Sequence, residues 1–495
     1  MRRTLCIVML IAAAATGCSR STPEQRTIND AATALGGRDR LLAVKTLVIE
    51  GLGTQGNLGQ DLTPESTLTS FNVADYKRTI DVAAGRVRTE FTRAPNFRYF
   101  AGQTRQKQVT GVDAAVGYNI AADGTATRVP DQTASDRRAE IYHHPVTSVR
   151  AALEQGATVT NARSENGQDL VDVKTAGGVA YTLAIDSATK LPARVRSMSD
   201  NTNLGDVIVE TVFGDYQATS GLQLPTHLTT KTDTVTAMDI RVQKQSVDAE
   251  AGDLAAPAAA ASAPVPPAAA PANVVVQPLA KGIWFLGGQS HHSVLVEFTD
   301  HLTLIEAPQN DVRALAVIAK ARELVPGKPL NQLVMSHHHF DHSGGVRAAI
   351  AEGLTVVVHK NAAAYIEAAA KRPHTLVPDA LARNAKPARV EAVDGQRVLT
   401  DGKMTVNLYA ISDSAHTDTM LMAYFPRERL LVEADMFTPG APVAPFVNNL
   451  LENITARKLQ IDRIVPLHGA VAPFSELMKT VRATVYPGQE PKSTN

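Results

Sequence analysis

An Ala/Pro-rich stretch divides the chain and restricts it to folds built from two separate parts. Residues 251–272 read AGDLAAPAAAASAPVPPAAAPA, a low-complexity composition with no periodic apolar face that is typical of a semi-extended linker. The chain has 495 residues, which is enough for two or three domains at about 150 residues each. We therefore expect a first domain over 25–250, a linker over 251–274 and a second domain over 275–490.

The charge balance and the cysteines exclude some classes of function. Lysine plus arginine and aspartate plus glutamate both number 49, so the formal net charge is zero. A nucleic-acid binder needs a basic excess for its phosphate contacts, so we expect no nucleic-acid partner. The two cysteines, Cys6 and Cys18, lie in the first 18 residues, which excludes a disulfide scaffold and a Cys-ligated zinc finger. Of 14 histidines, 11 follow residue 290, and this asymmetry points to the second half for function.

The first half contains many short strand-like runs, among them KTLVIEGLG, VAYTLAIDS and DVIVETVFGDY. Turn residues such as Asn-Gly at 166–167 separate several of them, which indicates an antiparallel meander. The pattern resembles the curved half-barrel of periplasmic lipoprotein-carrier proteins, and this resemblance implies a lipid- or lipoprotein-binding module. His143 and His144 precede Pro145 and are interpreted as turn residues, and the half as a scaffold or binding module.

The second half alternates strand-like and helix-like segments. Strands are expected at GIWFLGG, SVLVEF, LTLIEA, NQLVMS, TVVVH, RVEAV, MTVNLYAI, TMLMAYF, RLLVEAD and DRIVPL. Helices are expected at 314–324, 344–352, 362–370, 446–459 and 473–485. This arrangement predicts sheets that are covered on the outside by helices, and with the β-rich first half it gives an α+β fold class.

A dense group of metal-ligating residue types follows one of these strands. Residues 336–345 read SHHHFDHSGG, with the spacing His337-x-His339-x-Asp341-His342. This HxHxDH spacing is the signature of the metallo-β-lactamase superfamily, which the chain resembles over residues 275–490. The resemblance implies an αββα sandwich for this half. It also implies a complete ligand set, made of His337, His339, Asp341, His342, His416, Asp435 and His468.

These residue types suit a pair of metal ions. His337, His339 and His416 can hold a first ion and leave its fourth position for water, as catalytic zinc sites do. Asp341, His342 and His468 can hold a second ion, and Asp435 can bridge both. Zinc is the default metal, and iron and manganese also suit these donors because no thiolate is available. The linker predicts that residues 275–495 retain this site when expressed alone.

Four further residues near the motif receive weaker assignments. His338 is expected to point away from the ligands. His291 and His292 lie in a loop that often overhangs the site in the family, so they are candidates for substrate contact. The family usually has Asp where this chain has Glu306, and that residue braces the metal-binding loop from behind.

The resemblance implies hydrolysis. We expect a metal-bound hydroxide to attack an ester, lactone, amide or similar bond of a small molecule, with Asp341 as the catalytic residue that orients or relays the water proton. The alternative within enzymes is metallo-β-lactamase activity, although Asp435 disfavours the branches that have cysteine or serine there. The alternative of another class is the lipid- or lipoprotein-binding protein suggested by the first half.

The N-terminus predicts export. Arg2 and Arg3 precede an apolar stretch over 5–15, which is long enough for a signal peptide and too short for a membrane-spanning helix. The residues ATGC at 15–18 resemble a bacterial lipobox, in which Cys18 is lipidated after cleavage. We therefore expect a signal peptide over 1–18 and a periplasmic protein anchored to the outer membrane only through its lipid.

Overall fold

The computed structural model describes residues 21–97 and 104–485. The expected signal peptide, including Cys18, lies outside these residues. Within them, no helix combines the length and the apolarity that a membrane crossing requires.

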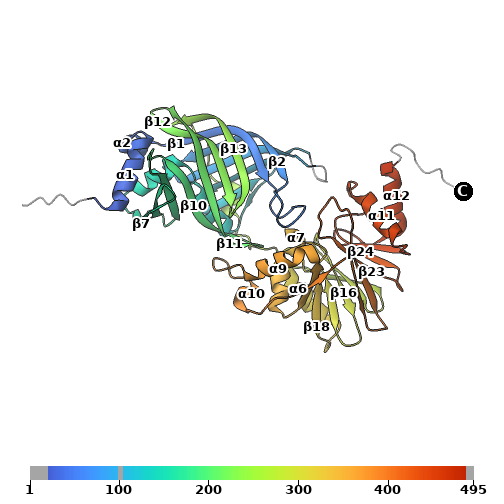
Figure 1. Ribbon diagram of the computed structural model, residues 1–495. Coiled ribbons are helices and arrows are strands. Elements are labelled where there is room, and N and C mark those ends of the chain that lie inside the picture. The colour runs from blue at the N-terminus through green and yellow to red at the C-terminus, as the bar shows by residue number, and fades with distance from the viewer. Residues whose placement is uncertain (1–20, 98–103, 486–495) are drawn as a thin grey trace, which may run out of the picture.

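The N-terminal half forms one large antiparallel sheet that curves strongly (Figure 1). Its order is β6-β5-β4-β3-β2-β1-β13-β12-β11-β10-β9-β8-β7, so two meanders are joined where the first strand pairs with the last. The strands are β1 (Thr46–Gly56), β2 (Ser70–Asp81), β3 (Arg86–Pro95), β4 (Gln106–Asp113), β5 (Val116–Ile120), β6 (Ala126–Arg128), β7 (Thr158–Glu165), β8 (Gln168–Lys174), β9 (Ala180–Asp186), β10 (Pro192–Asn201), β11 (Gly205–Thr219), β12 (Leu222–Thr232) and β13 (Val235–Val247). The expected antiparallel β-rich domain is confirmed, whereas its likeness to carrier proteins stays a prediction.

Helices cover part of this sheet and complete its core. They are α1 (Pro23–Leu35), α2 (Arg38–Ala43), α3 (Asp131–Glu140) and α4 (Pro145–Leu153). Thr22 begins α1 with a reciprocal capping box to Gln25. The apolar face of α1, with Ile28 and Leu35, packs into the same core as Leu47 of β1.

His143 and His144 lie in the turn before α4, as expected, and both are buried. The two ring nitrogens of His143 lie 2.9 Å from Ser197 Oγ and 2.9 Å from Thr211 Oγ1. His144 is the N-cap of α4, where its Nδ1 accepts a hydrogen bond from the Val146 backbone.

The C-terminal half contains two further sheets. The first has the order β14 (Val275–Ala280), β15 (Ile283–Gly287), β16 (Ser293–Glu297), β17 (Leu302–Ile305), β18 (Leu330–Val334), β19 (Thr355–His359) and β20 (Arg389–Val393), with parallel pairing from β17 onward. The second has the order β21 (Gln396–Thr400), β22 (Thr405–Ala410), β23 (Leu421–Phe425), β24 (Leu430–Glu433), β25 (Arg463–Pro466) and β26 (Ala472–Pro473).

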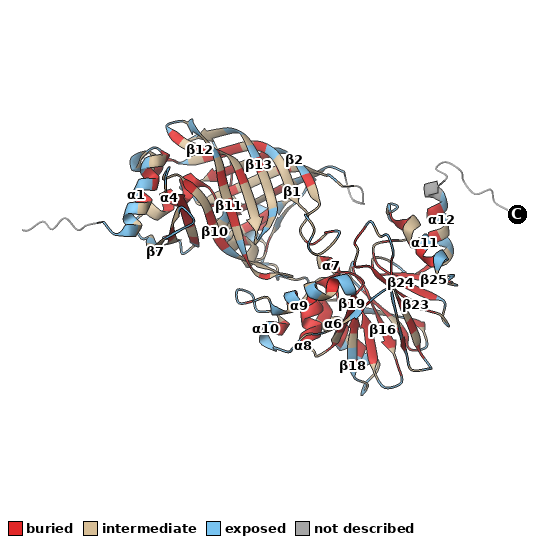
Figure 2. Ribbon diagram, viewed as in Figure 1, coloured by how far each residue is buried: buried red, intermediate tan, exposed pale blue. Residues whose placement is uncertain are grey.

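The two sheets pack face to face, with helices on both outer faces. In β16, Val294 and Val296 point toward the other sheet while Leu295 points toward the helices, as the two-residue period of a strand requires. Figure 2 shows that these strands are buried along most of their length. The helices are α6 (Asp311–Leu324), α7 (Phe340–Ser343), α8 (Val346–Ala351), η1 (Lys360–Ala362), α9 (Ala363–Lys371), α10 (Ala380–Arg383), α11 (Val447–Ala456) and α12 (Phe474–Val485). The expected αββα sandwich is confirmed.

The Ala/Pro-rich segment is only partly the extended tether that its composition predicts. It contains the short helix α5 (Ala258–Ser262), and Ala260 is fully buried. Tyr118 of β5 donates a hydrogen bond to the Leu254 carbonyl, and Arg128 of β6 donates one to the Ala263 carbonyl. Because alanine side chains are small, the segment packs closely against the end of the N-terminal sheet.

The two halves also contact each other at the turns of β10–β11 and β12–β13. Asp206 accepts hydrogen bonds from the backbones of Thr375 and Leu376, and Arg372 forms an ion pair with Asp233 at 2.6 Å. These contacts hold the N-terminal sheet against the loop that follows α9.

Candidate metal centre

The predicted ligands lie in loops at the carboxyl ends of strands. His337 and His339 lie between β18 and α7, and His342 lies within α7. His416 precedes β23, Asp435 follows β24 and His468 follows β25. Because these strands end at the same edge of the sandwich, the structure brings all seven predicted metal ligands together in two adjacent clusters.

The first cluster, called cluster 1, consists of His337, His339, His416 and Asp435, whose ligand atoms lie within 4.8 Å of one another. Asp435 Oδ2 lies 2.9 Å from His416 Nε2 and 3.1 Å from His337 Nε2. These are the three histidines expected to hold the first ion, with the carboxylate beside them.

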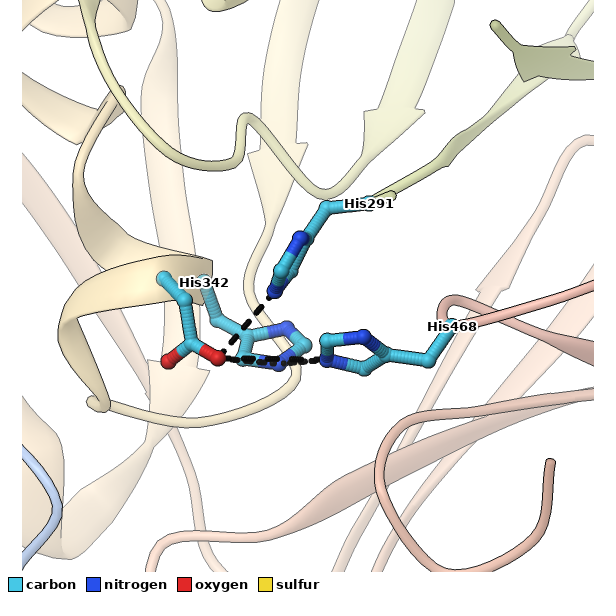
Figure 3. Close-up of side chains that lie close together, drawn as sticks. His291, His342 and His468 are labelled. Atoms are coloured by element: carbon cyan, nitrogen blue, oxygen red, sulfur yellow. Dashed lines mark hydrogen bonds and ion pairs between the residues drawn. The ribbon is translucent and has the colours of Figure 1, made fainter. Parts of the chain in front are cut away.

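The second cluster, called cluster 2, consists of His291, Asp341, His342 and His468. His291 Nε2 lies 3.1 Å from Asp341 Oδ2, and His342 Nε2 lies 2.8 Å from His468 Nε2. Figure 3 shows His291, His342 and His468 with their rings turned toward a common centre. His291 is a member of cluster 2, and its predicted role as a substrate contact stays a prediction.

Asp435 connects the two clusters. Its Oδ2 faces His337 and His416 of cluster 1 and also lies 3.1 Å from His342 Nε2 of cluster 2. Its Oδ1 lies 2.7 Å from His468 Nε2 of cluster 2. The residue has a φ of +64°, in the left-handed region, so the backbone is held in a conformation that non-glycine residues seldom adopt. One carboxylate thus contacts histidines of both clusters.

The protonation states suit a cation. Burial lowers the pKa of His337 and His339 well below their ordinary range, so both rings are neutral and keep a lone pair for a metal. The buried Nδ1 of His339 has no hydrogen-bond partner among the described residues. Burial also opposes the ionisation of Asp435, but the charges of His342 and His468 outweigh it and hold its pKa well below the usual range. A buried carboxylate beside the neutral imidazoles of His337 and His339 is a donor set that suits a divalent metal.

Two glutamates hold the metal-binding loops from behind. Glu306 Oε2 accepts hydrogen bonds from Ser336 Oγ at 2.5 Å and from His342 Nδ1 at 2.9 Å, so the longer Glu side chain reaches the bracing position. Glu433 Oε2 accepts the backbone N–H groups of Met436 and Phe437, which fixes the turn that carries Asp435. The bond from Nδ1 of His342 to Glu306 leaves Nε2 of His342 directed at the other members of cluster 2.

A buried arginine holds the loop that carries His291. The Arg313 side chain donates to the carbonyls of Leu286, Gly287 and His291 at 3.0–3.2 Å. His292, the other predicted substrate contact, packs its ring on Phe285 at 4.8 Å between centroids and lines the pocket. The predicted non-ligand His338 turns away and lies 2.8 Å from Thr419 Oγ1.

A pocket of about 560 Å³ opens over both clusters. Its lining includes Gln60, Ser290, His292, Asp341, His416 and Phe446. The size is sufficient for a small-molecule substrate.

One part of the site was not foreseen from the sequence. Gln60 of the N-terminal half donates from Nε2 to Asp341 Oδ1 at 2.8 Å, and His339 Nε2 lies 2.9 Å from the Asp61 carbonyl. These partners are separated by 281 and 278 residues, and no local spacing or composition marks such contacts.

Comparison with known proteins agrees with this geometry. Residues 286–480 match the family model described as the metallo-beta-lactamase superfamily. The comparison with curated proteins finds no match.

Solved structures similar to this chain include three metallo-beta-lactamases. The DIM-1 enzyme is 14% identical, with a TM-score of 0.34 and coverage of 42% of this chain and 94% of the enzyme. The enzyme from Hirschia baltica is 17% identical, with a TM-score of 0.33 and coverage of 43% and 97%. The FIM-1 enzyme from Pseudomonas aeruginosa, in a mono-zinc form, is 17% identical, with a TM-score of 0.34 and coverage of 44% and 96%. Similarities at this level say nothing about substrate.

The part of the chain that carries both clusters, residues 286–480, therefore belongs to the metallo-beta-lactamase superfamily of hydrolases.

Proposed function

We propose that this chain is an exported, metal-dependent hydrolase that cleaves an ester, lactone, amide or similar bond of a small molecule. The observation that carries the proposal is the position of Asp435, whose carboxylate lies within 3.1 Å of histidines of both clusters. An arrangement of this kind supports two ions, zinc by default and iron or manganese as other metals that suit the donors. When bound, the ions supply a Lewis acid that acidifies water and polarises the bond under attack.

The residues of the chain have distinct roles in this proposal. His337, His339 and His416 hold the first ion, and Asp341, His342 and His468 hold the second. Asp341 is also the catalytic residue that orients the attacking water or relays its proton. Burial raises the pKa of its carboxyl, but the His291 hydrogen bond and the charge of His342 outweigh this and keep the pKa well below the usual range. Asp341 is therefore ionised at neutral pH and able to accept a hydrogen bond.

The open pocket supports a small substrate rather than a macromolecule. His292, at its wall, is a candidate for substrate contact, as is His291. The alternative enzymatic function is hydrolysis of β-lactams. The alternative from another class of function is lipid or lipoprotein binding by the N-terminal sheet.

The test combines metal analysis with a substrate panel on protein that lacks residues 1–18. We expect about two metal ions per chain, and turnover of an ester, lactone or amide that chelation abolishes and added Zn²⁺ restores. His301→Ala changes a histidine outside both clusters and should leave metal content and turnover unchanged. A folded protein that is metal-free and fully active would overturn the proposal, and exclusive turnover of β-lactams would favour the first alternative. Lipid binding by a protein without hydrolytic activity would favour the second.

Export and anchoring belong to the same proposal. We expect the protein in the outer-membrane fraction of bacterial cells, and Cys18→Ser should release it into the soluble periplasm because the variant lacks the thiol that would carry the lipid. An unchanged distribution of the Cys18→Ser variant would contradict lipidation.

A further inference from the structure

The β1–β2 loop, residues 57–69, extends from the N-terminal sheet to the metal centre (Figure 1). Its residues 59–62 contact two separate segments of the C-terminal domain, 339–341 and 417–418. The Gly59 carbonyl accepts a hydrogen bond from the Phe340 backbone at 3.1 Å. The Leu62 carbonyl accepts one from Thr417 Oγ1 at 2.8 Å and one from the Asp418 backbone at 2.9 Å.

The loop contacts a ligand of each cluster between these two anchoring points. The Asp61 carbonyl can only accept a hydrogen bond, so its partner, Nε2 of His339, must carry the ring proton. The other nitrogen, Nδ1, then has a lone pair and faces His337, His416 and Asp435. Gln60 donates to Oδ1 of Asp341, while His291 contacts Oδ2, so the carboxylate of Asp341 is held from both sides.

The remaining contacts between the two halves hold the loop in this place. Asn203, in the β10–β11 turn, donates to the Phe340 carbonyl at 3.0 Å. The Phe340 backbone is thus bonded to the N-terminal domain through both its N–H and its carbonyl. Gly59 has a φ of +81°, and a Cβ there would lie 2.2 Å from the Phe340 ring, so this close approach requires glycine.

We propose that the β1–β2 loop is a working part of the metal centre, in which the Asp61 carbonyl sets the tautomer of His339 and Gln60 positions Asp341. The inference rests on the proposed metal site. Gln60 and Asp61 are positioning residues, since each acts through a ligand, and the N-terminal domain is then required for full metal affinity. Partners that orient metal ligands in this way typically change affinity by about 10–100-fold when removed.

The test measures binding of Co²⁺ to the metal-free full-length protein, with the visible absorption spectrum as the readout. Gln60→Glu keeps the size of the side chain and replaces the donor to Asp341 with a repelling carboxylate. We expect the second Co²⁺ to bind about 10–100-fold more weakly, while the first binds as in the wild type. The matched control is Gln289→Glu, which places the same charge in the same pocket, and it should have a much smaller effect.

A second pair of variants tests the loop as a whole. Gly59→Val adds a Cβ against the Phe340 ring and should withdraw the loop, so that both ions bind more weakly and the Co²⁺ spectrum changes. Gly85→Val is its control, because Gly85 also has a positive φ of +64° but has no atom within 4 Å of its added Cβ. Circular dichroism checks that each variant is folded.

The outcomes distinguish failure of the loop inference from failure of the proposed function. If folded Gln60→Glu and Gly59→Val proteins bind both Co²⁺ ions with wild-type affinity and spectrum, the loop inference is wrong while the proposed hydrolase stands. If the wild type itself binds no Co²⁺, the proposed function fails and the inference fails with it.

Discussion

The two halves of the molecule meet at one site but differ in how they contribute to it. The C-terminal half supplies side chains that can ligate metals, from loops at the ends of strands that are buried on both faces. The N-terminal half supplies one amide side chain and several backbone carbonyls, from a long loop of a sheet that is only partly covered. The C-terminal half therefore provides the groups that can bind metal, and the N-terminal half provides groups that hold them in place.

The two halves also differ in how much of their contribution can be predicted from the sequence. Ligands must be particular residue types at particular spacings, so they leave a motif. A carbonyl that orients a histidine is present in every residue and leaves none. Variants in each half show whether the two kinds of contribution differ in the size of their effects.

The largest effect is expected at Asp341 of cluster 2. Asp341→Asn keeps the size of the side chain but removes the charge that binds the second ion and the group that handles the proton. We expect the second metal to be depleted and turnover to fall by at least about a hundredfold, since loss of a proton-handling group typically costs ~10²–10⁴ in rate. Metal analysis and steady-state kinetics check this result.

Asp300→Asn is the control for Asp341→Asn. Asp300 is an exposed aspartate of the same domain, so its loss of charge should alter neither metal content nor turnover. Near-wild-type turnover by Asp341→Asn with both metals bound would contradict the role given to this carboxylate.

His291 should have a smaller effect than Asp341. His291→Ala removes a contact to Asp341 Oδ2 and one donor of cluster 2, while the other three members remain. We expect the second ion to bind about 10–100-fold more weakly, as when a partner of a ligand is lost. Titration of the metal-free protein with Zn²⁺ measures this change.

The neighbouring residue supplies the control for His291. His292→Ala alters the same loop, but its ring packs on Phe285 and belongs to neither cluster. It should leave both affinities unchanged. Equal losses from His291→Ala and His292→Ala would show that the loop, rather than the His291 ring, is responsible.

The sequence predicted the parts of the site that depend on local spacing. His337, His339, Asp341 and His342 lie within one loop and the helix turn after it, so their convergence follows from the motif. Asp435 and His468 were assigned because the resemblance to the metallo-β-lactamase superfamily implies ligands at the ends of these strands. His291 was placed only near the site, because the loop that carries it is held by Arg313 from a distant helix.

The sequence could not predict contacts that depend on docking of the two halves. Gln60 and Asp61 meet their partners across the contact between the two halves, where the β10–β11 turn is also docked. Neither residue type is unusual in a loop. The Ala/Pro-rich composition suggested a free tether, yet Tyr118 and Arg128 hold its carbonyls. The prediction that residues 275–495 keep the metal site alone is untested, and the loop contacts lead us to expect weaker metal binding by that fragment.

The smallest expected effect is at the buried histidines of the N-terminal half, which stabilise the fold and belong to neither metal cluster. Burial lowers the pKa of His143 from its ordinary 6.5 to about 3, so the ring stays neutral in the folded protein. Between these two values the unfolded chain binds more protons than the folded protein, and the free energy of unfolding therefore falls as the pH falls. From pH 6.5 to about pH 5.5, His143 alone should cost about 1 kcal/mol.

Urea unfolding at the two pH values measures this cost in the N-terminal sheet. Circular dichroism follows the strands, while the fluorescence of Trp284, the one tryptophan of the chain, reports on the C-terminal domain separately. His143→Gln keeps a polar side chain near Ser197 and Thr211 but removes the titration, so its pH dependence should be smaller by about 1 kcal/mol. His301→Gln, a histidine of the C-terminal domain, should keep the wild-type pH dependence of the circular dichroism transition. If His143→Gln also keeps the wild-type pH dependence, burial of a neutral His143 does not support the fold. His143 would then be free to gain a proton without loss of the fold.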